Sequence, residues 1–154
     1  SDRRIEAKEL VVIDFGCIVD GYCSDMTRTV SVGDPGPEAR RIYETVHEAQ
    51  AAGCAEVAVG VECAAVDARC REVISEAGWG EAFVHGTGHG VGLEIHEAPR
   101  VASTAAGILE RGNVVTVEPG VYLPGIGGVR IEDTLVVTPD GPIALTEFPK
   151  ELVL

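Results

Sequence analysis

The sequence predicts a fold of the α+β class. Strand-like segments come first, two helix-like segments follow, and further strand-like segments close the chain; regular alternation would instead have indicated βαβ units. Apolar residues make up 45% and charged residues 24% of the 154 residues, which is typical of a globular domain with its own core. We therefore expect residues 1–154 to form one domain.

The first two strands form a predicted hairpin. Leu10–Gly16 (LVVIDFG) is expected to be a buried strand, with Met26–Val32 as its partner. Between them, Asp20-Gly21 is a strong signal for a two-residue turn. Asp14 then faces Thr27, which fixes the register of the hairpin.

Two helices and a group of strands follow. Pro37 is well placed to open the first helix, and Gly60 separates it from the second. Apolar residues recur at helical spacing in both, at Ala39, Ile42, Tyr43, Val46 and Ala49, and then at Val66, Cys70, Val73, Ile74 and Ala77. Three later segments predict an antiparallel meander: Val114–Glu118, Val129–Val137 and Pro142–Leu145.

Composition excludes several classes of function. The net charge of −13 disfavours binding to nucleic acid, which requires clustered Lys and Arg. No apolar run approaches the roughly 20 residues that cross a bilayer, and the polar opening SDRRIEAKEL is unlike a signal peptide. Five cysteines without a CxxC pair favour a reduced, cytoplasmic setting, and Cys63 and Cys70 are expected to be core residues.

Four carboxylates lie inside apolar strands. In the predicted hairpin, Asp14 and Asp25 point to the same face as diagonal neighbours. A turn near Gly125 would bring the strands of Glu118 and Glu132 alongside each other. Buried carboxylates that are ionised and unpaired are unstable, and their like charges repel.

Bound cations would resolve this charge. Pairing with arginine is the alternative, but only Arg28 and Arg130 lie close in sequence, so two of the four acids would lack a positive partner. Four carboxylates and one histidine could hold two divalent ions. His89 has the tightest glycine frame of the histidines in HGTGHGVGLEIHE, which makes it the best candidate ligand. Such an oxygen-rich set favours manganese or another octahedral ion.

Five stretches together resemble the pita-bread metallopeptidases, in particular the prolidase and Xaa-Pro aminopeptidase group. In chain order they are IDFG with Asp14, GYCSDMTRT with Asp25, HGTGHGVGLEIHE with His89, VEPGVY with Glu118 and VRIEDTLVVT with Glu132. The resemblance runs to the closing PKELVL. It implies a mixed curved sheet with helices on its outer face, incomplete at the N-terminus.

The resemblance implies a role for each metal ligand. Asp14 would bind one ion in bidentate fashion, while Asp25 and Glu132 would bridge both ions. His89 and Glu118 would complete the ligand set, and Glu118 would also act as general base. The ions would most commonly be manganese, with cobalt or zinc as alternatives.

Further residues receive roles from the same resemblance. His96 would steady the substrate or the tetrahedral intermediate, and His85 would act near the leaving group. Arg130 would orient a metal-binding carboxylate from outside the ligand set. Arg100, in HEAPR, matches an arginine with which some prolidases hold the free carboxylate of a dipeptide; a surface arginine is the alternative.

The implied activity is hydrolysis of the bond between an N-terminal residue and proline, in dipeptides or short peptides, by a protein that is a homodimer in its full-length form. Members of the group carry another catalytic histidine shortly before the segment that begins SDR, and a smaller N-terminal domain. We therefore expect this chain to be the C-terminal portion of the catalytic domain. It would bind metal but show weak or no peptidase activity unless the missing segment is supplied.

Other readings remain open. A methionine aminopeptidase would use the same ligands, although GYCSDMTRT and HEAPR favour the proline-specific group. Creatinase shares the fold but lacks the metal. A non-catalytic pita-bread module that binds peptides or proteins is the alternative from a different class, and five retained ligands count against it.

Overall fold

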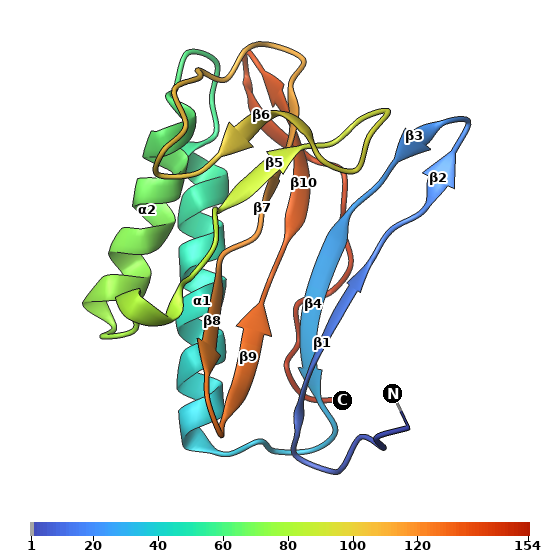
Figure 1. Cartoon of the computed structure of the whole chain (residues 1–154), viewed down its shortest axis with the longest axis vertical. Coiled ribbons are helices and arrows are strands. Elements are labelled where there is room, and N and C mark those ends of the chain that lie inside the picture. The colour runs from blue at the N-terminus through green and yellow to red at the C-terminus, as the bar shows by residue number, and fades with distance from the viewer. Residues whose placement is uncertain (1) are drawn as a thin grey trace.

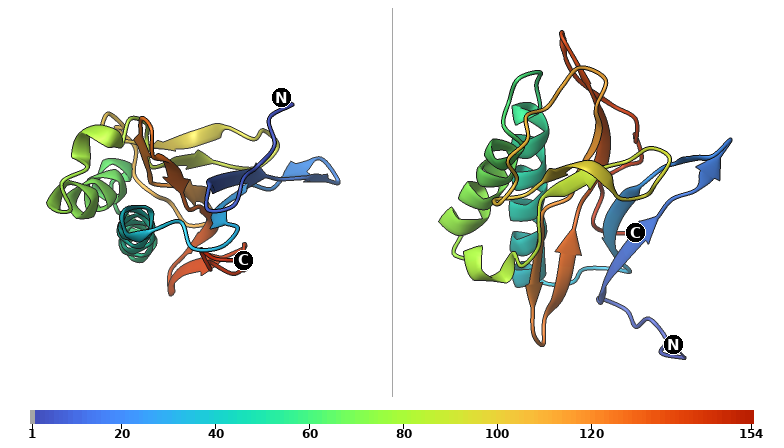
Figure 2. Two further views of the ribbon diagram at one scale, coloured as in Figure 1. Left: turned by 90° about the horizontal axis from the view of Figure 1, so that it is seen from below. Right: turned by 45° about the horizontal axis from the view of Figure 1, so that its top comes forward.

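The computed structural model describes residues 2–154 and places two helices along one side of the strands (Figure 1). Helix α1 spans Pro37–Glu56, α2 spans Cys63–Glu76, and a short 3₁₀ helix, η1, spans Gly80–Ala82. The two views in Figure 2 show the N-terminal strands on the opposite side of the molecule from the helices. The predicted α+β order is confirmed.

The strands form one larger sheet and three two-stranded ladders. The five-stranded sheet has the order β11-β10-β7-β5-β6, and the ladders are β1-β4, β2-β3 and β8-β9, all with antiparallel pairing. The strand bounds are Leu10–Phe15 (β1), Ile18–Val19 (β2), Tyr22–Cys23 (β3), Met26–Ser31 (β4), Gly88–Gly90 (β5), Glu97–Val101 (β6), Val114–Val117 (β7), Gly120–Leu123 (β8), Gly127–Arg130 (β9), Asp133–Thr138 (β10) and Gly141–Ala144 (β11).

The N-terminal hairpin has the predicted turn and register. Asp20 and Gly21 both have positive φ, 51° and 88°, as a two-residue turn of this kind requires. Asp14 pairs with Thr27, as predicted. The prediction that this first strand is buried was wrong, because β1 pairs only with β4 among residues 2–154 and the helices lie on the far side. Its Phe15 side chain is accordingly 45% exposed.

Both helices bury the faces that the apolar spacing predicted. Pro37 occupies the first turn of α1, where its missing N–H leaves no bond unmade. The residues of the two predicted faces that join the core are Ala39, Ile42, Tyr43, Val46, Ala49, Val66, Cys70 and Ile74. Cys63 and Cys70 are fully buried core residues, as expected. No helix within residues 2–154 is long and apolar enough to span a membrane.

The predicted meander is present, with one correction. Strands β7, β10 and β11 pair antiparallel in that order. The segment Val129–Val137, however, is not one strand: it divides into β9 and β10. The β8-β9 and β7-β10 ladders share one register, since Gly120 pairs with Arg130 and Val117 with Asp133. Glu118 and Glu132 therefore face each other where the ladder is interrupted.

A buried ionic network ties the C-terminal segment to the sheet. The Asp133 carboxylate accepts hydrogen bonds from Arg28 (2.8 Å) and Gln50 (2.9 Å), and pairs with the ammonium group of Lys150. Arg28 also donates to the carbonyl oxygen of Phe148 (2.8 Å). The network thus joins β4, β10, α1 and the C-terminal segment.

We predict that Asp133→Asn lowers the free energy of unfolding by about 3 kcal/mol, because it leaves the buried Arg28 guanidinium without its counterion. Urea unfolding of the metal-free protein would measure this change. Asp34→Asn is the matched control, since Asp34 forms an ion pair with Arg40 at the same distance, 2.8 Å, but at the surface. Equal effects of the two substitutions would contradict the prediction.

Candidate metal centre

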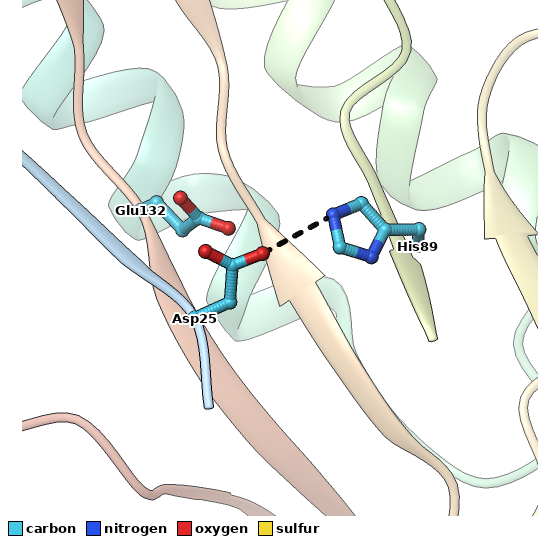
Figure 3. A group of neighbouring side chains, drawn as sticks. All are labelled: Asp25, His89 and Glu132. Carbon is cyan, nitrogen blue, oxygen red and sulfur yellow. Dashed lines mark ion pairs between the residues drawn. The ribbon is translucent and has the colours of Figure 1, made fainter. Parts of the chain in front are cut away.

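Five strand ends bring the predicted ligands to one place. Asp14 lies in β1, Asp25 directly before β4, His89 in β5, Glu118 directly after β7, and Glu132 between β9 and β10. One ligand atom each from Asp25, His89 and Glu132 lies within 4.8 Å of the other two (Figure 3). His89 Nε2 lies 3.2 Å from Glu118 Oε1. Four of the five sequence-predicted ligands therefore lie together.

Asp14 stands at the exposed edge of this group. Its carboxylate forms an ion pair with Arg130, and its side chain is 53% exposed. Burial raises the pKa of Asp25, and the negative charge of Asp14 raises it further. The two aspartates are thus neighbours that repel each other, as the hairpin register predicts.

Glu132 is the most deeply buried of the four acids at the site, with 1% of its surface exposed. Its Oε2 accepts a hydrogen bond of 2.6 Å from the Thr27 hydroxyl, while its Oε1 has no partner among residues 2–154. Burial raises the pKa of Glu132 to about 8, and the negative charge of Glu118 contributes to this. A buried carboxylate oxygen without a donor is the kind of atom that a cation would satisfy.

The hydrogen bonds of His89 orient one ring nitrogen toward the acids. Nδ1 lies 3.0 Å from the Gly90 carbonyl oxygen, which can only accept, so Nδ1 carries the proton. Nε2 faces Asp25 Oδ2 at 3.6 Å as well as Glu118. In the neutral ring its lone pair would point at carboxylate oxygens. Burial lowers the pKa of His89, but the hydrogen bonds to Glu118 and Gly90 outweigh this and raise it.

These residues fit a bound cation. One ligand atom each of His89, Glu132 and Asp25 lies close to the other two, and a cation among them would relieve the repulsion of the carboxylates (Figure 3). Oxygen atoms with one imidazole are ligands suited to hard or borderline divalent ions.

The glycines beside His89 allow close packing of β5. A Cβ atom on Gly88 would lie 2.0 Å from the Thr116 carbonyl oxygen, and one on Gly90 would lie 2.4 Å from that of Ala98. No side chain fits at either position, because neighbouring backbone occupies the space. The glycine frame of His89 therefore places the imidazole by letting its strand lie tightly between β6 and β7.

Arginine neutralises only part of the acid cluster, which consists of Asp14, Asp25, Glu118 and Glu132. Arg130 binds Asp14 and lies 3.8 Å from Glu118 Oε2. It also donates to the hydroxyl oxygens of Thr27 (3.3 Å) and Tyr122 (3.2 Å). Arg28 instead forms its ion pair with Asp133, outside the acid cluster. The carboxylates of Asp25 and Glu132 form no ion pair with an arginine among residues 2–154.

The other sequence-predicted residues line a cavity of about 490 Å³ beside the ligands. His85, His96 and Arg100 all border it, together with His89, Glu118 and Arg130. The imidazole of His96 lies 4.2 Å from that of His89, centroid to centroid. A second cavity, of about 580 Å³, lies on the Asp14 and Asp25 side and has apolar walls from Phe15, Ile18 and Ile95.

Three polar residues at the site were not singled out from the sequence. Tyr122 donates its hydroxyl hydrogen to His85 Nε2 (2.9 Å), since the other ring nitrogen of His85 bonds to the Gly86 carbonyl oxygen. Thr27 bonds to Glu132 and Thr116 to Glu118. The position of Thr27 opposite Asp14 could have indicated its role from the sequence. The contact of Tyr122 could not be predicted locally, because it depends on how β8 meets residues 85–97, the histidine segment.

Known proteins with similar sequences include peptidases. Residues 1–139 match the model of metallopeptidase family M24. The uncharacterized peptidase YqhT of Bacillus subtilis is 49% identical over 154 residues, which are all of this chain and 44% of that protein. The Xaa-Pro dipeptidase of Pyrococcus furiosus is 48% identical over 153 residues, 99% of this chain and 44% of that protein.

Solved structures confirm the predicted pita-bread fold. The Xaa-Pro dipeptidase from Bacillus anthracis superposes with a TM-score of 0.98 at 50% identity, covering 100% of this chain and 44% of that one. The N-terminal domain of the FACT complex subunit SPT16 from chickpea superposes at 0.86 but is only 18% identical, which shows a common fold alone. The chain spans less than half the length of the curated relatives and solved structures named here. It belongs to metallopeptidase family M24.

Proposed function

We propose that this chain carries the metal site of an Xaa-Pro peptidase, which hydrolyses the bond between an N-terminal residue and proline in dipeptides or short peptides. The observation that carries the proposal is the group of Asp25, His89 and Glu132, which lies beside Glu118 and contains a buried Glu132 oxygen with no hydrogen-bond partner among residues 2–154. Relatives named Xaa-Pro dipeptidase at 48% identity support the substrate class.

We assign Asp14, Asp25, His89, Glu118 and Glu132 as the residues that hold two divalent ions, with manganese as the metal. When bound, such ions supply a water of lowered pKa and polarise the substrate carbonyl. Residues 1–154 would then be the C-terminal portion of a catalytic domain that acts as a homodimer in the cytoplasm.

The chain's own residues would move protons and orient the substrate. Glu118 accepts a proton as general base, since its carboxylate borders the cavity. His96, on the wall of the same cavity, donates a hydrogen bond to an oxygen that gains charge during the reaction. His85, whose Nε2 accepts the hydroxyl hydrogen of Tyr122, lies on the same wall and acts near the leaving group. Arg100 binds the free carboxylate of a dipeptide, and Arg130 holds Asp14 in place from outside the ligand set.

Metal counting tests the ligand set. We expect the manganese-loaded chain to hold about two ions, and Asp25→Ala and Glu132→Ala each to lose most of this metal, because each removes an oxygen ligand. Elemental analysis after gel filtration measures the count. Asp140→Ala, in the exposed turn after β10, is the control and should match the parent. A folded parent without metal would favour the binding-module alternative.

Substrate choice tests the activity. We expect a chimera, in which this chain replaces the matching 153 residues of the Pyrococcus furiosus Xaa-Pro dipeptidase, to hydrolyse Leu-Pro much faster than Leu-Ala or Met-Ala. Release of the free C-terminal amino acid, proline or alanine, would be followed by chromatography with manganese present, with the intact relative as positive control. A chimera that folds and binds metal but prefers Met-Ala would instead indicate a methionine aminopeptidase.

The metal-free protein should lose stability as the pH rises. The pKa of Glu132 is about 8 in the folded state and 4.5 ordinarily, so the folded state retains a proton that the unfolded chain releases between these values. The contribution of Glu132 to stability is therefore fully present below pH 4.5 and is lost as the pH rises to about 8. Asp25 and His89 also have raised pKa values and act in the same direction.

Glu132→Gln should flatten this decline, because the amide does not titrate. Urea unfolding in the presence of a chelator, at several pH values, would measure it in parent and variant. Identical pH profiles for the two proteins would show that Glu132 does not hold the extra proton.

A further inference from the structure

Two charged side chains of α2 hold the backbone that leads to His89. Asp67 is fully buried, and its Oδ1 accepts hydrogen bonds from the Thr87 amide (3.0 Å) and the Thr87 hydroxyl (2.9 Å). One helical turn later, Arg71 donates to the carbonyl oxygens of Phe83 (2.9 Å) and His85. The two side chains also pair with each other, Arg71 Nε lying 2.6 Å from Asp67 Oδ2.

Together they bind alternate residues of the segment that leads into β5: backbone groups of residues 83, 85 and 87 all face α2. The glycine-rich segment that follows has little intrinsic preference for one conformation, because glycine adopts many. The ordering of this segment therefore has to come from contacts outside it.

The bond network continues from Thr87 to the metal ligands. The Thr87 carbonyl oxygen accepts a hydrogen bond of 2.7 Å from the amide of Glu118. Two residues on, the amide of His89 donates to the Thr116 hydroxyl (3.1 Å), which in turn donates to Glu118 Oε1 (3.2 Å). One residue, Thr87, thus separates the Asp67 carboxylate from the backbone of a ligand.

We propose that Asp67 and Arg71 are positioning residues for His85, His89 and Glu118. The proposal rests on the proposed function, since those residues form its site. A buried carboxylate with several donors and a guanidinium that bridges two carbonyl oxygens make strong, directional hydrogen bonds. Arginine is required, because the single ammonium group of lysine cannot reproduce the planar fork.

The same helix carries a matched pair with no such connection. Arg69 and Glu72 also form an ion pair within α2, but both side chains are about half exposed, and they contact no part of the histidine segment in the described bonds. If the Asp67–Arg71 pair only stabilised α2, substitutions in the two pairs would have similar effects.

Manganese affinity of the full chain distinguishes the two roles. We expect Arg71→Lys and Asp67→Asn to weaken manganese binding by about 10-fold or more, as loss of partners outside a ligand set typically does. Arg69→Lys is the control and should bind as the parent does. Isothermal titration with manganese alone gives the affinities. Parent-like affinity in a folded Arg71→Lys protein would overturn the proposal.

A metal-free measurement separates this proposal from the proposed function. Amide hydrogen exchange, followed by NMR with a chelator present, should be faster at Thr87, Gly88 and His89 in Arg71→Lys than in the parent, with α1 equally protected in both. If the parent binds no manganese, the proposed function fails, and exchange alone decides the positioning role. Unchanged exchange in this segment would refute it.

Discussion

The repulsion among carboxylates around Glu132 is the constraint on which this structure depends. Asp25 and Glu132 are buried beside Glu118 without an arginine of their own, and Glu132 Oε1 has no donor among residues 2–154. Nearby hydroxyl groups, such as that of Thr27, supply neutral hydrogen bonds but no positive charge. Only a proton or a bound cation neutralises such a group, and membership of a metallopeptidase family makes the cation the natural choice.

Alternation along one segment of backbone separates the Glu132 carboxylate from the cations Arg28 and Lys150. Glu132 and Asp133 are consecutive, so their side chains point to opposite sides. Asp133 meets Arg28 and Lys150, whereas Glu132 meets other acids. Arg28 also donates to the carbonyl oxygen of Glu132. The guanidinium that neutralises Asp133 therefore also holds the backbone of Glu132. Stability and the candidate metal site thus share one stretch of backbone.

Much of the fold follows from local patterns. The turn at Asp20-Gly21, the start of α1 at Pro37 and the buried helix faces all depend on residues within a few positions of each other. The expectation of a buried first strand failed because burial depends on neighbouring strands, which a run such as LVVIDFG does not reveal. The prediction of one undivided strand over Val129–Val137 was wrong because the ladder is interrupted where Glu132 meets Glu118.

The sequence by itself determined how the four acids pair, whereas the tertiary structure brought the two pairs and His89 together. The hairpin register and the turn near Gly125 are local, and they bring Asp14 beside Asp25 and Glu118 opposite Glu132. Only the tertiary structure decided which acid is neutralised, because Arg28 and Asp133 lie 105 residues apart. It alone also showed that α2 holds the histidine segment. Such contacts depend on how distant elements pack, and residue spacing carries no record of that packing.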